Sequence, residues 1–168
     1  MRFDQLAPVA ANKIHGMPFD QVHKLIYKGQ PNFLNMPLPK AYSEDIPADI
    51  LSTLEINETL LDLYGFLQKV AVGLEQAIWD QEDNDGDFAT QFKETEKFLR
   101  VVLCELLTAL EGRGVAKRPD VTRDVLKDED RRMDHTGAQS RDFKILREYI
   151  TVLDYTVKAL SHFMTHLS

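Results

Sequence analysis

The sequence predicts an all-α protein, an up-up-down-down four-helix bundle with two long crossover loops. Two observations lead to this fold class. Apolar residues recur at steps of three and four over three long segments, which is the spacing of one helix face. The connecting segments are long, short and long, whereas simple up-down bundles use short loops throughout. No strand-like alternation of useful length interrupts the pattern.

The clearest helix is the last one, expected over residues about 141–167. Ser140 stands just before it and Asp142 lies in its expected first turn, and both favour a helix start at this point. Its apolar stripe extends over about seven helical turns. The stripe consists of Phe143, Leu146, Ile150, Leu153, Val157, Leu160, Met164 and Leu167. We expect this stripe to face the protein core.

Two more helices are expected over residues about 50–80 and 87–111. The first carries the apolar stripe Ile56, Leu60, Leu63, Leu67, Val70, Leu74 and Ile78. The second carries Phe88, Phe92, Leu99, Val102, Leu106 and Leu110. Gly112 and Gly114, with Pro119 beyond them, supply a stop signal. Each helix is expected to be about 30 Å or longer at 1.5 Å per residue.

The first helix is expected over residues about 7–28, where the apolar spacing is less regular. Pro8 favours a start, because the first turn of a helix does not need the N–H that proline lacks. Gly16 and Pro18 then interrupt the segment and predict a kink near Gly16. The four helices together form one expected domain, residues 1–168, since this length is typical of a single domain.

The three links between the helices predict the topology. Residues 29–48 contain four prolines and form a long link, residues 81–86 form a short link, and residues 112–140 form a second long link. The short link predicts that the second and third helices are antiparallel neighbours. A crossing of about 30–40 Å needs about 12 extended residues, so each long link can return the chain to the far end of the bundle.

Charge and apolar content exclude several function classes. The chain has 20 Lys and Arg against 27 Asp and Glu, a net charge of -7, and no four consecutive basic residues, so nucleic-acid binding is not expected. No run of 18 apolar residues occurs, so membrane insertion is not expected. The start Met1–Asp4 lacks the basic and apolar regions of a signal peptide, which leaves open whether a leader has been removed.

Cys104 is the one cysteine, so no disulfide can form within the chain. This favours a leaderless or cytosolic origin, because secreted domains often carry disulfides. Val102, Leu103 and Leu106 surround Cys104 in the sequence and predict a buried, inert thiol.

No residue constellation for catalysis is evident, and neither enzyme activity nor a cofactor nor a metal is expected. Di-iron bundles need Glu-x-x-His pairs, and none of the five histidines has Glu three residues before it. His162 and His166 have a spacing that can hold zinc, but no further ligand suggests itself. The turn from Gln81 to Phe92 lacks carboxylates at the first and twelfth positions of a calcium loop.

Several short motifs occur in the order of a known protein family. They are Ala11–His15 and Leu25–Gln30 in the first helix, Pro31–Leu34 in the link after it, Leu63–Leu74 in the second helix, Val102–Cys104 in the third and Tyr155–Lys158 in the last. On these motifs the chain resembles the interleukin-6 family of long-chain helical cytokines, in particular its branch of ciliary neurotrophic factor and leukaemia inhibitory factor. One departure is at the start of the last helix, where the family's Phe-x-x-Lys pair is replaced by Phe143 and Leu146.

The resemblance implies an extracellular signalling ligand, secreted or released without a leader, that acts as a monomer. Such a ligand binds and clusters cell-surface cytokine receptors and thereby activates JAK/STAT signalling. The implied partners are a shared signalling receptor together with a leukaemia-inhibitory-factor-type receptor or an alpha receptor.

The resemblance also implies three receptor-binding faces. The first face combines the outer sides of the first and third helices, with candidates Asn12, His15, Lys24, Gln91, Glu94, Val101, Glu105 and Thr108. The second uses Phe143, Lys144 and Arg147 at the start of the last helix. The third uses Tyr155, Lys158 and His162 near its end, beside Phe33. Phe143 also fits the inner stripe, so a core position for it stays open.

The alternative hypothesis is a cytosolic four-helix scaffold or adaptor without receptor activity, which presents an amphipathic groove to partner helices. The single cysteine and the start without a leader-like segment favour it. Binding to receptor ectodomains discriminates between the two hypotheses.

Overall fold

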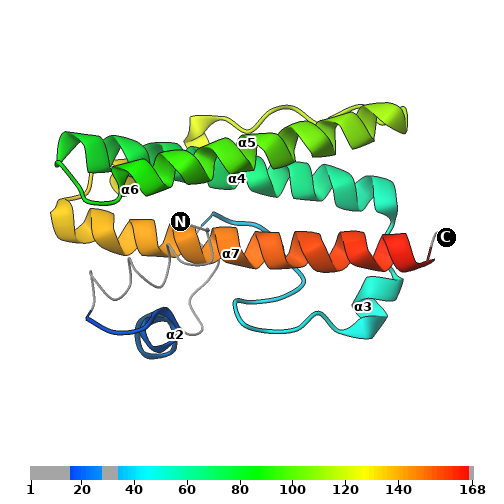
Figure 1. The fold of residues 1–168 in the computed structure, drawn as a ribbon, viewed down its shortest axis with the longest axis horizontal. Helices are drawn as coiled ribbons and strands as arrows, with labels where there is room; N and C mark the ends of the chain where they lie inside the picture. The colour runs from blue at the N-terminus through cyan, green and yellow to red at the C-terminus, as the bar shows by residue number, and fades with distance from the viewer. Residues whose placement is uncertain (1–15, 28–33, 167–168) are drawn as a thin grey trace.

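The computed structural model describes residues 16–27 and 34–166, of which 72% are helical, with no strand among them. This confirms the all-α class. The helical elements are α2 (Phe19–Val22), the π-helix η1 (His23–Tyr27), α3 (Ala48–Ser52), α4 (Ile56–Asp83), α5 (Ala89–Gly112), the 3₁₀ helix η2 (Arg123–Val125), α6 (Asp128–Arg131) and α7 (His135–His166). Three of them, α4, α5 and α7, are long and lie lengthwise beside one another (Figure 1).

The helix α4 occupies the middle of this arrangement and packs against both α5 and α7. It runs antiparallel to α5, to which a short turn connects it, while α7 runs in the same direction as α5 (Figure 1). Its buried face contains Leu63, Leu67, Val70 and Leu74, all fully buried, which are members of the stripe that the sequence predicts for this segment. The stripe of α4 is therefore confirmed as a core-facing surface.

The start of α4 differs from the prediction of one helix from about residue 50. A short helix, α3, ends at Ser52, and Thr53 follows it with its hydroxyl donating to the carbonyl of Ile50 at 2.8 Å. The chain is extended at Glu55, and α4 begins at Ile56. Threonine competes for helix carbonyls in this way and favours helix ends over helix interiors.

The start of α7 also differs from the prediction. The helix begins at His135, about one and a half turns before Ser140, because Asp134 caps it. The Asp134 carboxylate accepts a hydrogen bond of 2.8 Å from the backbone N–H of Gly137, which is the bond that an N-cap aspartate makes to the third helical residue. Ser140 is consequently an interior residue of α7, and Asp142 lies well inside it.

The buried face of α7 is wider than the predicted stripe and rotated from it in the C-terminal half. Val157 and Met164, two members of the predicted stripe, are 63% and 70% exposed. The buried positions continue instead along Ile145, Tyr149, Val152, Thr156, Ala159 and Phe163. The predicted inner face is therefore wrong at Val157 and Met164, whereas Leu153 and Leu160 are half-buried against the core. Leu167 lies outside the described residues.

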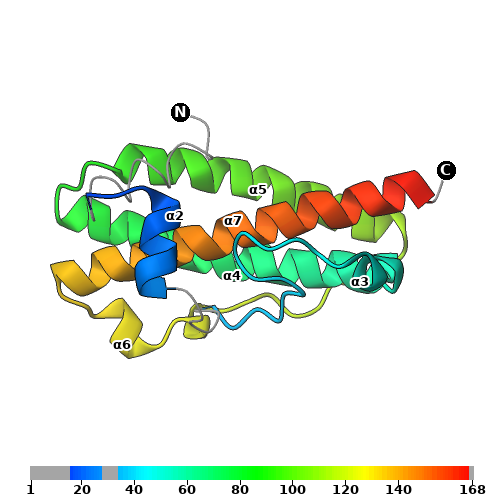
Figure 2. The same ribbon diagram turned by 90° about the horizontal axis from the view of Figure 1, so that it is seen from below.

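The segment before the first long link is broken where the sequence predicts a kink. Gly16 has φ of +66°, a left-handed conformation that favours glycine, and Pro18 precedes α2 with an extended backbone. Figure 2 shows α2 crossing α7 at a steep angle. Phe19 of α2 stacks on Phe143 of α7, with ring centroids 4.5 Å apart. The expected helix over residues 7–15 lies outside the described residues.

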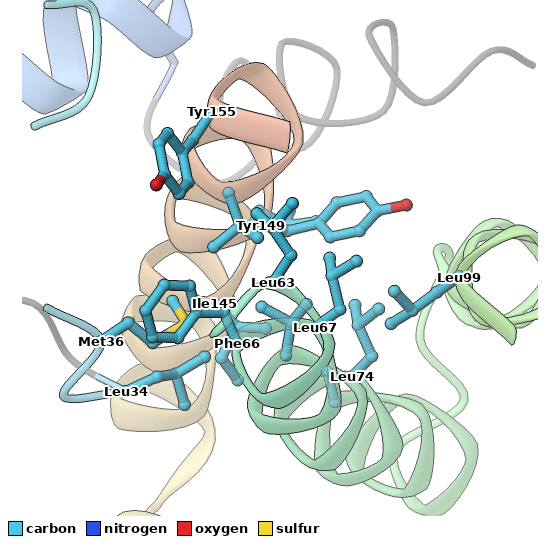
Figure 3. Packing of buried hydrophobic residues seen from close by; sticks show 14 of the residues in the cluster. Leu34, Met36, Leu63, Phe66, Leu67, Leu74, Leu99, Ile145, Tyr149 and Tyr155 are labelled. Carbon is cyan, nitrogen blue, oxygen red and sulfur yellow. The ribbon is translucent and has the colours of Figure 1, made fainter. Parts of the chain in front are cut away.

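The described part of the first long link, residues 34–47, is anchored in the core. Leu34 and Met36 are buried beside Phe66 of α4 and Ile145 of α7 (Figure 3). Farther along, Tyr42 contacts the Phe19 ring at 5.2 Å and donates a hydrogen bond of 2.7 Å to Asp20. This link and α2 together cover one side of α7.

The second long link returns along α4 and is held to it by a ladder of polar contacts. Successive residues of the link contact successive positions of α4: Arg113 with Asn57, Arg118 with Glu58 and Asp62, Asp120 with Gln68, and Arg123 with Glu75. The Arg123 guanidinium also lies 4.8 Å from the Trp79 ring. Residue numbers rise along the link and along α4 in the same order, so the link runs parallel to α4, from the end of α5 towards the start of α7.

Candidate functional site

Four candidates of the first predicted face lie on one side of α5. Glu94, Val101, Glu105 and Thr108 are all exposed, and their spacings of seven, four and three residues place them on the same helix face. These residues are exposed because α5 buries its opposite side, including Phe92, Leu99 and Leu106, against α4. Val101 is 58% exposed, which is a large fraction for a valine in the middle of a helix.

Gln91, the fifth candidate on α5, lies near the edge of this face. Gln91 as a whole is half-buried, and its side-chain oxygen is buried without a hydrogen-bond partner among the described residues. A buried amide oxygen that makes no hydrogen bond carries a desolvation cost. The Gln91 side chain is therefore only partly available to a partner from solution.

Two residues that are not among the predicted surface candidates belong to the same face of α5. Phe98 is 65% exposed and lies one turn before Val101. Cys104 is exposed and lies one turn after Val101, so the prediction of a buried thiol is wrong. Three hydrophobic neighbours in the sequence suggested burial, but the helix turns Cys104 towards solvent between them. We call Glu94, Phe98, Val101, Cys104, Glu105 and Thr108 the α5 face.

The structure does not join the described part of the first segment to the α5 face. Lys24 is exposed in η1. Figures 1 and 2 place α2 and η1 on the far side of α7 from α5. Asn12 and His15 lie outside the described residues, so their relation to the α5 face remains a prediction.

The second predicted face is mostly interior. Phe143 is 1% exposed, and α2 covers it through the ring stack with Phe19. Arg147 is 4% exposed, and its guanidinium donates to the Glu148 carboxylate at 2.7 Å. Lys144 is half-buried. We therefore remove Phe143 and Arg147 from the candidate surface, because their side chains do not reach solvent.

The third predicted face is divided between core and surface. Tyr155 is 4% exposed and packs in the hydrophobic core, so it too leaves the candidate surface. His162 is half-buried, and its ring centroid lies 4.2 Å from that of His166. Phe33 lies outside the described residues.

Lys158, the remaining candidate of the third face, ties the first long link to α7. Its ammonium group lies 2.7 Å from the Asp45 carboxylate of the link and 3.0 Å from Asp154 one turn earlier on α7. Lys40, whose side chain is 3% exposed, also pairs with Asp154. A shallow hollow of about 280 Å³ lies over this network and is lined in part by Ser43 and Thr151.

The ionic network around Lys158 shifts the pKa values of its members. The hydrogen bonds that Lys158 donates, first to Asp45 and then to Asp154, raise its pKa to about 12. The hydrogen bond from Lys158 in turn lowers the pKa of Asp45. Partial burial raises the pKa of Asp154, but the hydrogen bonds from Lys40 and Lys158 outweigh it and lower the value overall. Lys158, Asp45 and Asp154 are therefore charged at neutral pH.

A buried ionic cluster joins the end of α4 to the start of α7. The Arg141 side chain is fully buried and pairs with Asp80 of α4 and with the neighbouring Asp142. It also donates to the backbone carbonyl of Asp130 at 3.1 Å. Burial raises the pKa of Asp142 to about 6 despite the guanidinium beside it. Because every charged group of the cluster has a partner, we interpret it as a structural lock between the two helices.

The described residues contain no group of three or more His, Cys, Asp or Glu side chains arranged to hold a metal ion. In that same part of the chain, the helices are either too short or too polar to cross a membrane. The chain matches no protein-family model, no curated protein and no solved structure. The α5 face and the surface around Lys158 are therefore defined by geometry alone.

Proposed function

We propose that the chain is an extracellular signalling ligand of the interleukin-6 type, which binds and clusters cell-surface cytokine receptors. The observation that carries the proposal is the α5 face, where Phe98 and Val101 are 65% and 58% exposed between charged residues. Exposed apolar side chains that lie together, with a polar rim, are typical of protein–protein interaction sites. This face contains Val101, the one apolar position that the resemblance to the cytokine family assigns to receptor contact on this helix.

We further propose that the chain has the up-up-down-down topology, in which α4, α5 and α7 are the second, third and fourth helices of the bundle. The parallel course of α5 and α7 supports this topology, because a parallel pair requires a connection that returns over the full bundle length. The ladder of contacts along α4 provides such a connection between Arg113 and Arg123. The first link also has sufficient length, since it includes residues 29–48.

The proposed mechanism involves no chemical step by the ligand. A ligand with two separate receptor-binding surfaces brings two receptors together, and the second receptor binds at a high effective concentration once the first is engaged. The α5 face supplies one such surface. The surface formed by the 34–47 link on α7, around Lys158 and Asp45, supplies the second. They lie on opposite sides of the molecule along the direction from α5 through α7 to the link (Figure 1).

The first test is surface plasmon resonance of the purified chain against a panel of interleukin-6-family receptor ectodomains. Val101→Glu should weaken binding to the shared signalling receptor by at least tenfold, since it places a charge in the apolar centre of the α5 face. Val157→Glu is the matched control, because Val157 is an equally exposed valine on α7, at 63%. We expect Val157→Glu to bind the shared signalling receptor with the affinity of the parent chain.

A panel in which no receptor binds would contradict the signalling proposal. The alternative function, a cytosolic scaffold or adaptor, is favoured by one observation, the exposed thiol of Cys104. An exposed free cysteine is stable in a reducing compartment and is oxidised more readily outside the cell. An adaptor would leave the receptors unbound, and its partners would be recovered from cell extract through the same α5 face.

A further inference from the structure

An apolar hollow of about 690 Å³ lies at the end of the bundle where α4 begins and where α5 and α7 end. Six apolar side chains and one arginine line it: Ile56, Leu60, Ala109, Leu160, Phe163, Met164 and Arg113. The hollow is open on one side, since Ala109, Arg113 and Met164 are exposed. Its volume lies within the range of about 300–1,000 Å³ that is usual for small-molecule sites.

Among the described residues that line the hollow, Arg113 is the only charged one, and Asn57 holds its side chain in place. Its Nε atom donates to the side-chain oxygen of Asn57 at 2.7 Å. In the described part of the chain, its two terminal nitrogens make neither a hydrogen bond nor an ion pair. A guanidinium in this position presents a fork of N–H donors at the rim of an apolar surface, which fits a carboxylate.

We propose that this hollow binds a single-chain aliphatic carboxylate, a fatty acid, with its head group on Arg113 and its alkyl chain over Leu60, Leu160 and Phe163. The positive charge of Arg113 determines which class of ligand the hollow accepts. A neutral hydrocarbon would leave the Arg113 fork without a partner, and a cationic amphiphile would be repelled by it. The chain of the ligand would cover apolar surface that includes the 70% exposed Met164.

The size and the open side of the hollow predict how affinity depends on chain length. Full burial of one methylene group corresponds to about fourfold in affinity. Because the hollow covers one side of an alkyl chain, we expect about twofold for each methylene between octanoate and dodecanoate. This dependence is independent of the receptor proposal, since it requires neither a receptor nor a cell.

The experiment is isothermal titration calorimetry of the full chain with octanoate, decanoate and dodecanoate, each below its micelle concentration at neutral pH. We expect one saturable site whose affinity rises with chain length. Arg113→Gln should weaken dodecanoate binding by about tenfold, because it replaces a charge-assisted hydrogen bond with a neutral one. Arg100→Gln, which changes an exposed arginine of α5 outside the hollow, should have no effect.

Ala109→Trp supplies a second variant that does not depend on charge. Ala109 is exposed at the rim, so an indole at this position fills the hollow without disturbing the buried core. It should abolish dodecanoate binding while the helical circular dichroism and the melting temperature stay unchanged. Thr90→Trp, at an exposed position near the start of α5, is the matched control and should bind normally.

Dodecanol and dodecyl phosphate separate the head-group chemistries. Dodecanol should bind at least tenfold more weakly than dodecanoate, and an equal affinity would overturn the role of Arg113. Tighter binding of dodecyl phosphate than of dodecanoate would replace the carboxylate with a phospholipid-type head group and overturn the fatty-acid assignment. An absence of saturable binding, or full binding by Ala109→Trp, would overturn the site itself.

Discussion

Gly65 and Gly73, two glycines in the interior of α4, allow a matched test of how tightly α4 packs on α7. A Cβ atom at Gly73 would lie 3.1 Å from both Cγ1 and Cγ2 of Ile145, which is fully buried on α7. A Cβ atom at Gly65 would have no atom within 4 Å. Alanine substitution at either position gains the same helix propensity, so the difference between the two variants isolates the contact with Ile145.

The expected free energies follow from these distances. Gly65→Ala should stabilise the protein by about 0.5–1 kcal/mol, because alanine replaces glycine in a helix interior with free space around it. Gly73→Ala has the same gain, but the added methyl must displace Ile145 within a packed core, which costs about 1–3 kcal/mol. We therefore expect Gly73→Ala to be less stable than Gly65→Ala by about 1–3 kcal/mol.

Urea unfolding followed by circular dichroism at one pH measures both variants against the parent chain. Ile145→Ala provides the control, since it removes the two carbon atoms that the new Cβ would meet. In that background the two glycine substitutions should be equally stabilising. The reasoning is refuted if Gly73→Ala is as stable as Gly65→Ala in the parent, because α7 would then yield to the added methyl without cost.

Three further predictions concern the charged groups and the thiol. Burial raises the pKa of Asp142 to about 6, above its ordinary value of 3.8. The stability that this carboxyl contributes is therefore fully present below about pH 4 and is lost as the pH rises through 6. In urea titrations, the unfolding free energy of the parent relative to Asp142→Asn should fall by about 3 kcal/mol between pH 4 and pH 7.5. Lys158→Glu should accelerate amide hydrogen exchange in residues 41–46, because it repels Asp45, and the double variant Asp45→Lys, Lys158→Glu should restore slow exchange. Cys104 should react with a chromogenic disulfide reagent in the native protein as fast as it does in urea.

Each of these three predictions has an outcome that contradicts it. A pH-independent difference between the parent and Asp142→Asn would mean that the ionic cluster does not penalise the charged carboxylate. Unchanged exchange in Lys158→Glu would show that Asp45 and Lys158 do not hold the link. A thiol that reacts only after urea is added would place Cys104 in the interior.

The long helices could be predicted from the sequence because apolar residues recur at steps of three and four along each of them. The leucines of α4 recur on one stripe, and the structure buries that stripe. In α7, two neighbouring stripes are both apolar, one through Val157 and the other through Phe163, and periodicity alone does not choose between them. The choice depends on where α4, α2 and the first link lie, which is tertiary information. The predicted start of α7 fell at Ser140 and missed the cap at Asp134, because both residue types are common at helix starts.

The same limit applies to the candidate site. Val101 could be predicted to be exposed, because it falls off the inner stripe of its helix. Arg147 and Tyr155 carry polar groups and read as surface residues, yet both are buried. Long polar side chains are seldom fully buried unless they are paired, and Arg147 pairs with the adjacent Glu148. Two oppositely charged neighbours in a sequence form the same pattern whether the ion pair is buried or exposed to solvent, so burial of Arg147 could not be predicted.

The surface of α7 around Lys158 presents acidic groups outermost, although the predicted contact residue is a lysine. The Lys158 side chain is 33% exposed, whereas the Asp45 side chain that pairs with it is 94% exposed, and Glu44 beside it is exposed as well. A receptor that approaches here meets acidic groups of the link before it meets the lysine. If this surface binds a basic surface of a receptor, then Asp45→Asn should slow association at low salt more than Lys158→Gln does, because long-range steering follows the outermost charge. The reverse order in surface plasmon resonance would show that the receptor displaces the link and contacts Lys158 directly.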